Sequence, residues 1–297
     1  MATNKIIEGT TYSEYAEMRG INISTLLYGE ISMRHLLAML TREIAPKDSA
    51  DLAFGRAFHT AALEPEHIAQ RHPVTTQCTA LTKNKTRCSN AGLWSGPDRK
   101  DWRCGIHKWP GDEECVDAIK PEEMERITGM LERLREHEVY SLLSVRGGVE
   151  SVVLFTHPDF PELQCKARLD KLIHAQGRKP QVIVDLKKTG FGGASNFETQ
   201  KAIEKYRYHQ KAAWYVDGVE AVTGNKSHFV WVFVEDQPPH EINVIQADSE
   251  TLEIGRLEYR SIFGRYAEAL REDRWPGYST KINQGGLSQR YRDRYTL

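Results

Sequence analysis

Three charged residues in the middle of the chain have types and spacing that could bind a metal ion. Asp170 lies in the run Leu163–His174, and Asp185 and Lys187 lie in the run Gln181–Thr189. Both runs have the composition of β-strands, and a short turn-rich link joins them. Residues two apart on a strand point to the same face, so Asp185 and Lys187 share a face and a hairpin can bring Asp170 beside them. Bringing two carboxylates and an ammonium group together costs free energy unless their charges are compensated. A bound divalent cation would provide this compensation.

The surrounding sequence gives this group a basic setting. Residues 178–211 carry eight Lys/Arg against three Asp/Glu. A basic patch beside a carboxylate cluster is what the cleavage of a phosphodiester requires. Two ordinary alternatives remain at this point. The three residues could form a surface salt bridge on a half-exposed sheet, and the basic stretch could be a solvated helix face.

A second group of residues, between positions 75 and 115, has the spacing of a metal site. The pattern is Cys-x9-Cys-x15-Cys-x2-His, formed by Cys78, Cys88, Cys104 and His107. In a chain that we expect in the cytosol, clustered cysteines with a nearby histidine favour a metal over disulfides. Two ligands on one tight turn suit tetrahedral zinc, which would stabilise a segment too polar to fold on its own core. The alternatives are unpaired reduced thiols, and Cys115 in place of His107.

The elements that position these residues follow from the hydrophobic pattern. We expect helices over 12–45, 50–64, from Pro121 to about 142, 196–217 and 249–272. We expect strands at 149–156, 163–173, 181–187, 229–234 and 241–247. The predicted core positions of the first two helices, together with one inert thiol in a strand, are Leu26, Leu27, Ile31, Leu36, Leu37, Leu40, Phe54, Phe58, Ala62 and Cys165.

The composition sets the class of protein. The chain has 297 residues, 40% of them hydrophobic and 27% charged, which is typical of a soluble globular protein. No apolar run approaches the roughly 18 residues that span a bilayer, and the first residues do not resemble a signal peptide. We therefore expect a cytoplasmic protein, in a bacterial or phage-infected cell, with no membrane partner. The net charge of −1 argues neither for nor against nucleic acid.

The order of these elements, with the acidic residues on the second and third strands, resembles the PD-(D/E)xK nuclease superfamily. Asp170 takes the place of the first aspartate, and Asp185-Leu-Lys187 takes the place of the (D/E)xK element. The closer resemblance is to the RecE-type and phage recombination exonucleases, which are similar to exodeoxyribonuclease VIII. The stretch from Gly55 to Pro65 resembles that family's Gly-x-x-x-His helix, and Tyr206–Gly218 resembles its next helix.

The resemblance covers about residues 20 to 270 and is interrupted by the cysteine segment. It implies an α/β fold of the restriction-endonuclease type, with a central mixed β-sheet flanked by helices and a small zinc-binding insertion. The expected division is an N-terminal helical part at 1–74, the zinc module at 75–115, the nuclease core at 116–275 and a polar basic tail at 276–297.

The helix after the catalytic strand departs from the family pattern. That helix often carries Gln-x-x-x-Tyr. Here Gln210 is followed four residues on by Trp214, and it is Lys211 that precedes Tyr215 by four. The cysteine segment also lies outside the family's core pattern, and it resembles small zinc modules inserted between the histidine helix and the strands.

The resemblance implies which residues form the active site. Asp170, Asp185, the backbone carbonyl of Leu186 and His59 would hold Mg²⁺ or Mn²⁺, ions that prefer hard ligands. Lys187 would orient a water molecule or stabilise the transition state. Glu150 takes the place of an acidic residue that some relatives use near the metal, and we predict that it is a catalytic residue. The alternative for Glu150 is an exposed strand carboxylate.

The resemblance also implies a partner and a reaction. The substrate would be linear duplex DNA, digested from an end in the 5′-to-3′ direction for recombination or repair. The predicted DNA contacts, to phosphates or to a frayed base, are Lys188, Lys205, Tyr206, Arg207, Gln210 and Lys211. Either Tyr206 or Tyr208 could instead pack in the core. A single-strand annealing protein and a homo-oligomer are further expected partners, by analogy with the family.

Two other classes of function remain open. The chain could be a non-catalytic module that binds DNA or docks a protein on a nuclease scaffold, although the complete Asp-Asp-x-Lys set argues against this. It could instead be an endonuclease or a Cas4-like or AddB-like nuclease. Those nucleases commonly carry an iron–sulfur cluster with three cysteines near the C-terminus, whereas this chain has no cysteine after Cys165.

Overall fold

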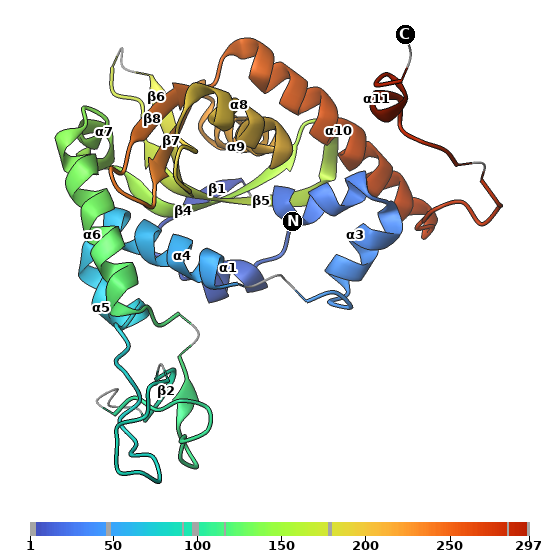
Figure 1. Ribbon diagram of the computed structural model, residues 1–297. Helices are drawn as coiled ribbons and strands as arrows, with labels where there is room; N and C mark the ends of the chain where they lie inside the picture. Colours follow the sequence, from blue (N-terminus) through green and yellow to red (C-terminus); the bar gives the residue numbers. More distant parts are fainter. Residues whose placement is uncertain are drawn as a thin grey trace.

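A six-stranded mixed sheet forms the centre of the computed structural model (Figure 1), which describes residues 4–45, 49–90, 92–96, 101–115, 117–177, 180–283 and 285–295. The spatial order is β1-β4-β5-β6-β7-β8. The bounds are Lys5–Ile7 for β1, Gly148–His157 for β4, Phe160–Ile173 for β5, Gln181–Thr189 for β6, Ser227–Glu235 for β7 and Ile242–Gln246 for β8. β6 and β7 run parallel, and the other neighbouring strands are antiparallel. The expected mixed sheet is confirmed; β1 was not predicted.

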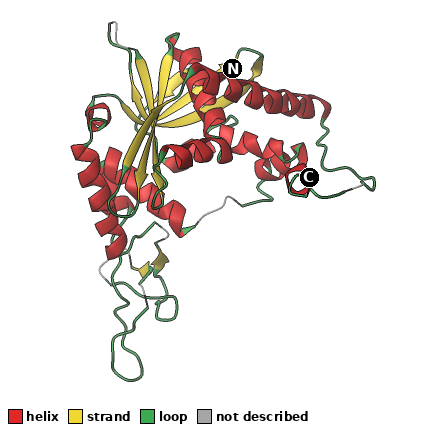
Figure 2. Ribbon diagram, turned by 45° about the horizontal axis from the view of Figure 1, so that its top comes forward, coloured by secondary structure: helices red, strands yellow, loops and turns green. Residues whose placement is uncertain are grey.

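The helices cover both faces of this sheet, as Figure 2 shows. Their bounds are Tyr12–Glu17 (α1), Ile23–Leu26 (α2), Met33–Leu40 (α3), Ala50–Leu63 (α4), Ile68–Arg71 (α5), Pro121–Glu136 (α6), Tyr140–Ser144 (α7), Asn196–Lys205 (α8), Tyr208–Thr223 (α9), Ser249–Glu272 (α10) and Gln289–Arg292 (α11). Short 3-10 turns span Leu27–Glu30 and Pro65–His67. In the part of the chain that the structure describes, no helix is both long enough and apolar enough to cross a membrane.

Two apolar layers hold the strands in place. The layer between the sheet and helices α9 and α10 is rich in aromatic side chains, and Trp214 at its centre is fully buried. The Trp214 ring contacts Phe155, Tyr259 and Phe263, with ring centroids 5.2, 5.3 and 5.6 Å away. The layer on the other face packs α4 and α6 against alternate residues of β6 and β7. Burial of this size makes the sheet a rigid support for whatever its strands carry.

Three of the long predicted helices are broken, one of them the helix expected from Pro121 to about 142, which consists of α6 and α7. The stretch 12–45 contains three short helices, and within it Ile31 and Leu40 are exposed, so their prediction as core residues is wrong. The stretch 196–217 is two helices, because Arg207 between them adopts a left-handed backbone with φ of 57°. A non-glycine residue in that region ends the regular helix and redirects the chain.

The cysteine segment lies outside both apolar layers and extends away from the sheet (Figure 1). A short stem joins it to the core: the Thr75 N–H donates to the Ile119 carbonyl at 2.7 Å, and the Ile119 N–H donates to the Pro73 carbonyl at 3.1 Å. Its regular structure among the described residues is one two-stranded sheet, formed by β2 (Trp94–Ser95) and β3 (Glu113–Glu114). The segment is thus an insertion of irregular chain between α5 and α6.

Candidate metal-binding and catalytic site

The candidate site lies where β5 and β6 separate. These strands pair over only three residues each, from Lys171 with Val184 to Ile173 with Val182. Beyond that point β5 stays paired with β4, and β6 stays paired with β7. The Leu186 N–H, which has lost its β5 partner, donates instead to Asp170 Oδ2 at 2.8 Å. The fork therefore fixes the Asp170 carboxylate against the strand that carries Asp185 and Lys187.

Two further side chains converge on Asp170 from other elements. His59, Glu150 and Asp170 each offer a ligand atom, and these atoms all lie within 4.8 Å of one another. His59 comes from α4, whose buried Phe58 and Ala57 pack in the apolar layer under the sheet, and its Nδ1 lies 3.5 Å from Asp170 Oδ2. A histidine and carboxylates in such proximity can share one cation.

Glu150 reaches this group through an unusual backbone. It lies on β4 between Val149 and Ser151, which pair with Lys171 and Leu169, so it faces Asp170 across the ladder. Its φ is 50°, in the left-handed region that a non-glycine residue rarely adopts in a strand. Strained backbone of this kind gathers at functional sites, because the surrounding structure must hold it. The conformation therefore favours a role for Glu150 over the alternative of an exposed strand carboxylate.

Charge repulsion and burial act together on the Glu150 carboxyl group. Burial, reinforced by the nearby Asp170 charge, raises the pKa of Glu150 to about 8, although Arg168 opposes this shift. Arg168 Nη1 lies 2.8 Å from Glu150 Oε2. A carboxyl group whose pKa is raised by burial and by a neighbouring carboxylate is one that a divalent cation would ionise.

Asp185 and Lys187 form a buried ion pair beside the His59–Glu150–Asp170 group. The Lys187 Nζ lies 2.5 Å from Asp185 Oδ2 and donates to the Leu186 carbonyl at 3.3 Å. Burial raises the pKa of Asp185, and the Lys187 charge only partly offsets this. Burial lowers the pKa of Lys187, but the charges of Asp185 and Asp170 outweigh it, so that pKa is raised overall. Lys187 is consequently a permanent cation at neutral pH.

Helix α9 contributes Lys211 and Tyr215 to the same side. Burial lowers the pKa of Lys211, and the Lys187 charge lowers it further. Burial raises the pKa of Tyr215, with the Asp185 charge as the next cause. Both groups therefore lie within electrostatic reach of β6.

The side chain of Gln210, the residue before Lys211 on α9, points toward α10. Its side chain is fully buried, and its Nε2 donates to Glu30 Oε1 at 2.6 Å and to Glu258 Oε2 at 2.7 Å. An amide enclosed between α9 and α10 does not reach a DNA strand, which contradicts the predicted contact. Neighbouring positions on a helix differ by about 100° in direction, so Gln210 and Lys211 cannot share the role.

The other predicted DNA contacts fall into two groups. Lys188 faces the opposite side of β6 from Lys187 and pairs with Asp51 and, at 3.4 Å, with Asp236. Its predicted contact with DNA stays a prediction. Arg207 is half exposed and pairs with Glu30 at 3.0 Å. Lys205 and Tyr206 are exposed, and their contact with DNA stays a prediction.

Arg168 is a functional candidate that the sequence did not single out. It lies two residues before Asp170 on β5, and the strand period of two is the signal that could have found it. Its Nε is buried without a hydrogen-bond partner among the described residues, while its Nη1 binds Glu150. A guanidinium beside Glu150 with an unpaired Nε has a donor that suits a phosphate oxygen.

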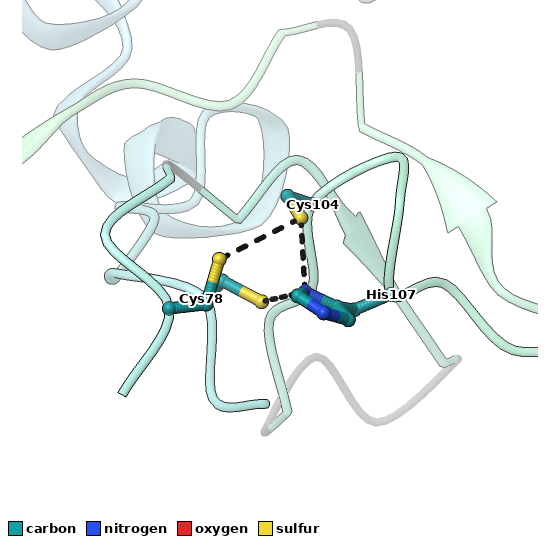
Figure 3. Close-up of side chains that lie close together, drawn as sticks. Cys78, Cys104 and His107 are labelled. Atoms are coloured by element: carbon teal, nitrogen blue, oxygen red, sulfur yellow. Dashed lines mark hydrogen bonds between the residues drawn. The ribbon is translucent and has the colours of Figure 1, made fainter. Parts of the chain in front are cut away.

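The four predicted ligands of the cysteine segment come together. Single atoms of Cys78, Cys88, Cys104 and His107 all lie within 4.8 Å of one another. Figure 3 shows the Cys78 and Cys104 sulfur atoms turned toward the His107 ring, whose Nδ1 lies 3.6 Å and 3.3 Å from them. Burial raises the pKa of the Cys104 thiol, but hydrogen bonds from Asn90, His107 and Ile106 outweigh it and lower that pKa to about 6. Three sulfurs and one nitrogen form the donor set of a closed tetrahedral site.

Comparison with known proteins gives one family. The model of the family described as "PDDEXK-like domain of unknown function (DUF3799)" matches residues 13–285. No curated protein matches the chain. A solved structure from Eubacterium rectale, described as "Putative exonuclease", is similar with a TM-score of 0.59 and 13% identity over 95% of this chain and 97% of that one. A second, that of SSO0001, has a TM-score of 0.26 and 13% identity over 48% of this chain and 60% of that one, and supports no argument.

Proposed function

Because this chain belongs to the family of PDDEXK-like domains, we propose that it is a divalent-metal-dependent deoxyribonuclease that hydrolyses phosphodiester bonds of linear duplex DNA. The membership confirms the resemblance to the PD-(D/E)xK superfamily. One observation supports the activity above all others. His59, Glu150 and Asp170 converge beside the Asp185–Lys187 pair at the fork of the sheet. Nothing about the fold requires so many ionisable groups in one buried place, and their desolvation is costly.

Mg²⁺ or Mn²⁺ would be held by Asp170, Asp185, the Leu186 carbonyl and His59. The oxygen-rich donor set fits these ions. Support comes from His59 Nδ1, which lies 3.5 Å from Asp170 Oδ2, whereas Asp185 is paired with Lys187. Such an ion would polarise the phosphate and lower the pKa of a bound water. A second ion near Glu150 would suit this carboxyl group, whose pKa is raised by burial and by the Asp170 charge.

The protein's own groups would position the substrate and stabilise charge. The Leu186 N–H holds the Asp170 carboxylate in one orientation. Lys187 remains an ammonium group at neutral pH and would face the phosphate, where negative charge grows in the transition state. Lys211 adds a second amino group on the same side, whose pKa is lowered by burial and by the Lys187 charge. The buried surroundings strengthen these interactions, because water screens them less.

We propose exonuclease action, in the 5′-to-3′ direction and for recombination or repair, as the more specific form of this function. The support is the resemblance of the histidine helix and the catalytic strand to RecE-type enzymes, together with the fold shared with the Eubacterium rectale structure. An annealing protein and a homo-oligomer are partners proposed on the same ground. An endonuclease is the rival activity on the same site.

We propose that the cysteine segment binds one zinc ion, which stabilises its structure. The support is the cluster of three thiols and one imidazole, in a segment that lies outside both apolar layers. Tetrahedral Zn²⁺ prefers this donor set, whereas Mg²⁺ and Mn²⁺ prefer oxygen. The two sites would therefore select different metals.

The test is the digestion of end-labelled linear duplex and of closed circular duplex by the wild-type chain with Mg²⁺, Mn²⁺ or EDTA. We expect mononucleotides from the linear DNA in either metal, intact circles and no product in EDTA. Cleavage of the circles would reject the exonuclease in favour of the endonuclease. Metal-independent binding with no product from either DNA would reject the nuclease and favour the non-catalytic module.

A further inference from the structure

We propose that α8 and the turn after it form a track that holds an unpaired DNA strand beside the catalytic lysine. This inference rests on the proposed nuclease function and names the form of its substrate, a strand that is single-stranded next to the scissile bond. The track is defined by Phe197, Lys201, Lys205, Tyr206 and Tyr208.

The track begins at the active site. The Tyr208 ring centroid lies 5.4 Å from the Nζ of Lys187 and 5.3 Å from the Nζ of Lys211. The Tyr206 ring follows, with its centroid 5.6 Å from that of Tyr208 and the two planes 33° apart. A tilted pair of rings thus leads outward from the ammonium group of Lys187. These tyrosines form a surface on which a flat base can stack.

The same alternation of ring and cation continues along α8. The Nζ of Lys205 lies 5.2 Å from the Tyr206 ring centroid, and the Nζ of Lys201 lies 4.1 Å from that of Phe197. Residues 197, 201 and 205 are four apart, so they form one stripe on the helix. At 1.5 Å per residue this stripe is about 12 Å long, enough for a few nucleotides.

This stripe is the exposed face of α8. Tyr206 is 51% exposed and Phe197 is 65% exposed, whereas Thr199 is buried and Ala202 and Ile203 pack against the aromatic layer. The helix thus buries one face and presents rings, ammonium groups and the carboxylates of Glu198 and Glu204 on the other. Glu198 Oε1 lies 2.8 Å from the Nζ of Lys201, so a phosphate would compete with this ion pair. Tyr208, the inner ring of the row, packs against the aromatic layer, and the exposed rings of Tyr206 and Phe197 continue the row outward along α8.

The turn between α8 and α9 directs the two tyrosines. Arg207 holds its left-handed backbone with Nη1 donating to the Glu204 carbonyl at 2.7 Å and Nε donating to Glu30 Oε2 at 3.0 Å. Because the turn is fixed from both sides, Tyr208 is directed toward Lys187 while Tyr206 remains exposed. Arg207 is therefore a positioning residue for the track, not a free phosphate contact.

The chemistry selects an unpaired strand. In a duplex the bases stack on one another and leave no face for a protein ring, whereas each base of a single strand has one. The ammonium groups between the rings would bind the phosphates without regard to sequence. Such a track suits an enzyme that separates a few base pairs at an end before cleavage. It would bind bases of any kind.

The experiment measures the affinity of the full chain for a short oligothymidylate by fluorescence anisotropy, in EDTA so that no cleavage occurs. We expect Phe197→Ala with Tyr206→Ala to weaken binding by at least about tenfold. Phe197→Tyr with Tyr206→Phe keeps both rings and should bind like the wild type. Tyr278→Ala removes a ring that is 72% exposed, beside His35, and serves as the matched control.

Two outcomes would overturn the track. One is equal affinity of the wild type and the double alanine variant. The other is a loss in the ring-keeping variant as large as in the alanine variant, because stacking could not then be its cause. Thermal melting of each variant identifies those that fail to fold, and only folded variants count. The nuclease function fails separately, when the wild type releases no product from linear DNA with Mg²⁺.

Discussion

In the sheet region, the strands that carry Asp170 and Asp185 are held between two apolar layers, whereas the buried cluster of the cysteine segment consists of Cys78, Cys88 and Cys104. In the first region, apolar side chains form the core, and the carboxylate and histidine ligands proposed for the metal contribute nothing to it. In the second region the ligands are the core. In the sheet region, where apolar packing already stabilises the fold, a bound metal is free to take part in catalysis. In the cysteine segment, which lacks such packing among its described residues, the metal is needed to stabilise the fold.

The largest expected effect is a loss of cleavage activity without loss of the fold in the sheet region. Lys187→Ala should lower the cleavage rate by on the order of 100-fold to 1000-fold, because a fixed cation at the phosphate is lost. The substitution leaves Asp185 without its ion-pair partner but removes no side chain from the two apolar layers, so the sheet region should stay folded. The measurement is the single-turnover rate on linear duplex with Mg²⁺, beside the melting temperature.

Lys226→Ala is the matched control, since Lys226 is exposed in the turn before β7, at the far end of the parallel strands from Lys187. It should cleave at the wild-type rate. If Lys187→Ala also cleaved at that rate, Lys187 would have no part in the reaction, and the ion pair with Asp185 would be structural.

The next effect should appear in the cysteine segment alone. Cys78→Ser with Cys88→Ser should abolish zinc binding, which contributes about 10–16 kcal/mol in comparable small modules. Elemental analysis should find one zinc per wild-type chain and none in the double variant. Limited proteolysis should cut that variant between residues 75 and 115 while the sheet region stays resistant.

Cys115→Ser is the control for this change, because Cys115 lies outside the four-residue cluster. It should retain the zinc. A wild-type zinc content in the Cys78–Cys88 double variant would reject the ligand set. Unfolding of the sheet region together with the segment would show that the two regions are not independent.

The reverse experiment removes apolar packing from the sheet region. Trp214→Ala leaves a large void among Phe155, Tyr259 and Phe263 and should cost about 3–5 kcal/mol of unfolding free energy. Zinc content should not change. Trp109→Ala in the cysteine segment, where the indole is 63% exposed, is the matched control and should leave the unfolding of the sheet region unaltered. Equal losses from both substitutions would contradict the division between the regions.

The smallest expected effect concerns pH and again the sheet region. Burial lowers the pKa of His157 below its ordinary value of 6.5, and the ring is bound to the Tyr259 hydroxyl at 3.0 Å. The unfolded chain therefore takes up a proton as the pH falls through 6.5 while the folded chain resists it, so stability should fall on acidification. It should stop falling once the pH passes below the folded pKa.

Urea unfolding at about pH 7.5 and about pH 5.5 measures this effect. His157→Gln should show a smaller difference between the two conditions than the wild type does, since glutamine does not titrate. An identical difference in both proteins would assign the acid sensitivity to other groups, such as His72, whose pKa burial also lowers.

The sequence was sufficient for the parts of this account that depend on local pattern. The strands around Asp170 and Asp185 were predicted from their alternation and composition, and the structure contains them. The Cys78–His107 cluster followed from ligand type and spacing, and it is present. Family membership agrees with the resemblance that the acidic residues suggested. Period and spacing are properties of a sequence, so they can be read from it.

The remaining features depend on tertiary geometry. The left-handed backbone of Arg207 is held by Glu30, which is far away in the sequence. This conformation separates α8 from α9, whereas the hydrophobic pattern predicted one continuous helix. The choice between Gln210 and Lys211 depends on which side of α9 faces the fork. The strained backbone of Glu150 leaves no local sequence signal, because a glutamate has no preference for that region.

The central claim is that the buried carboxylates at the fork perform metal-dependent cleavage of DNA. Its most direct test compares the wild type with Asp185→Asn on end-labelled linear duplex with Mg²⁺. Asparagine keeps the shape of the side chain and removes its charge. We predict that the wild type releases nucleotides and that the variant, folded and with full zinc content, releases none. Cleavage by Asp185→Asn at the wild-type rate would contradict the account.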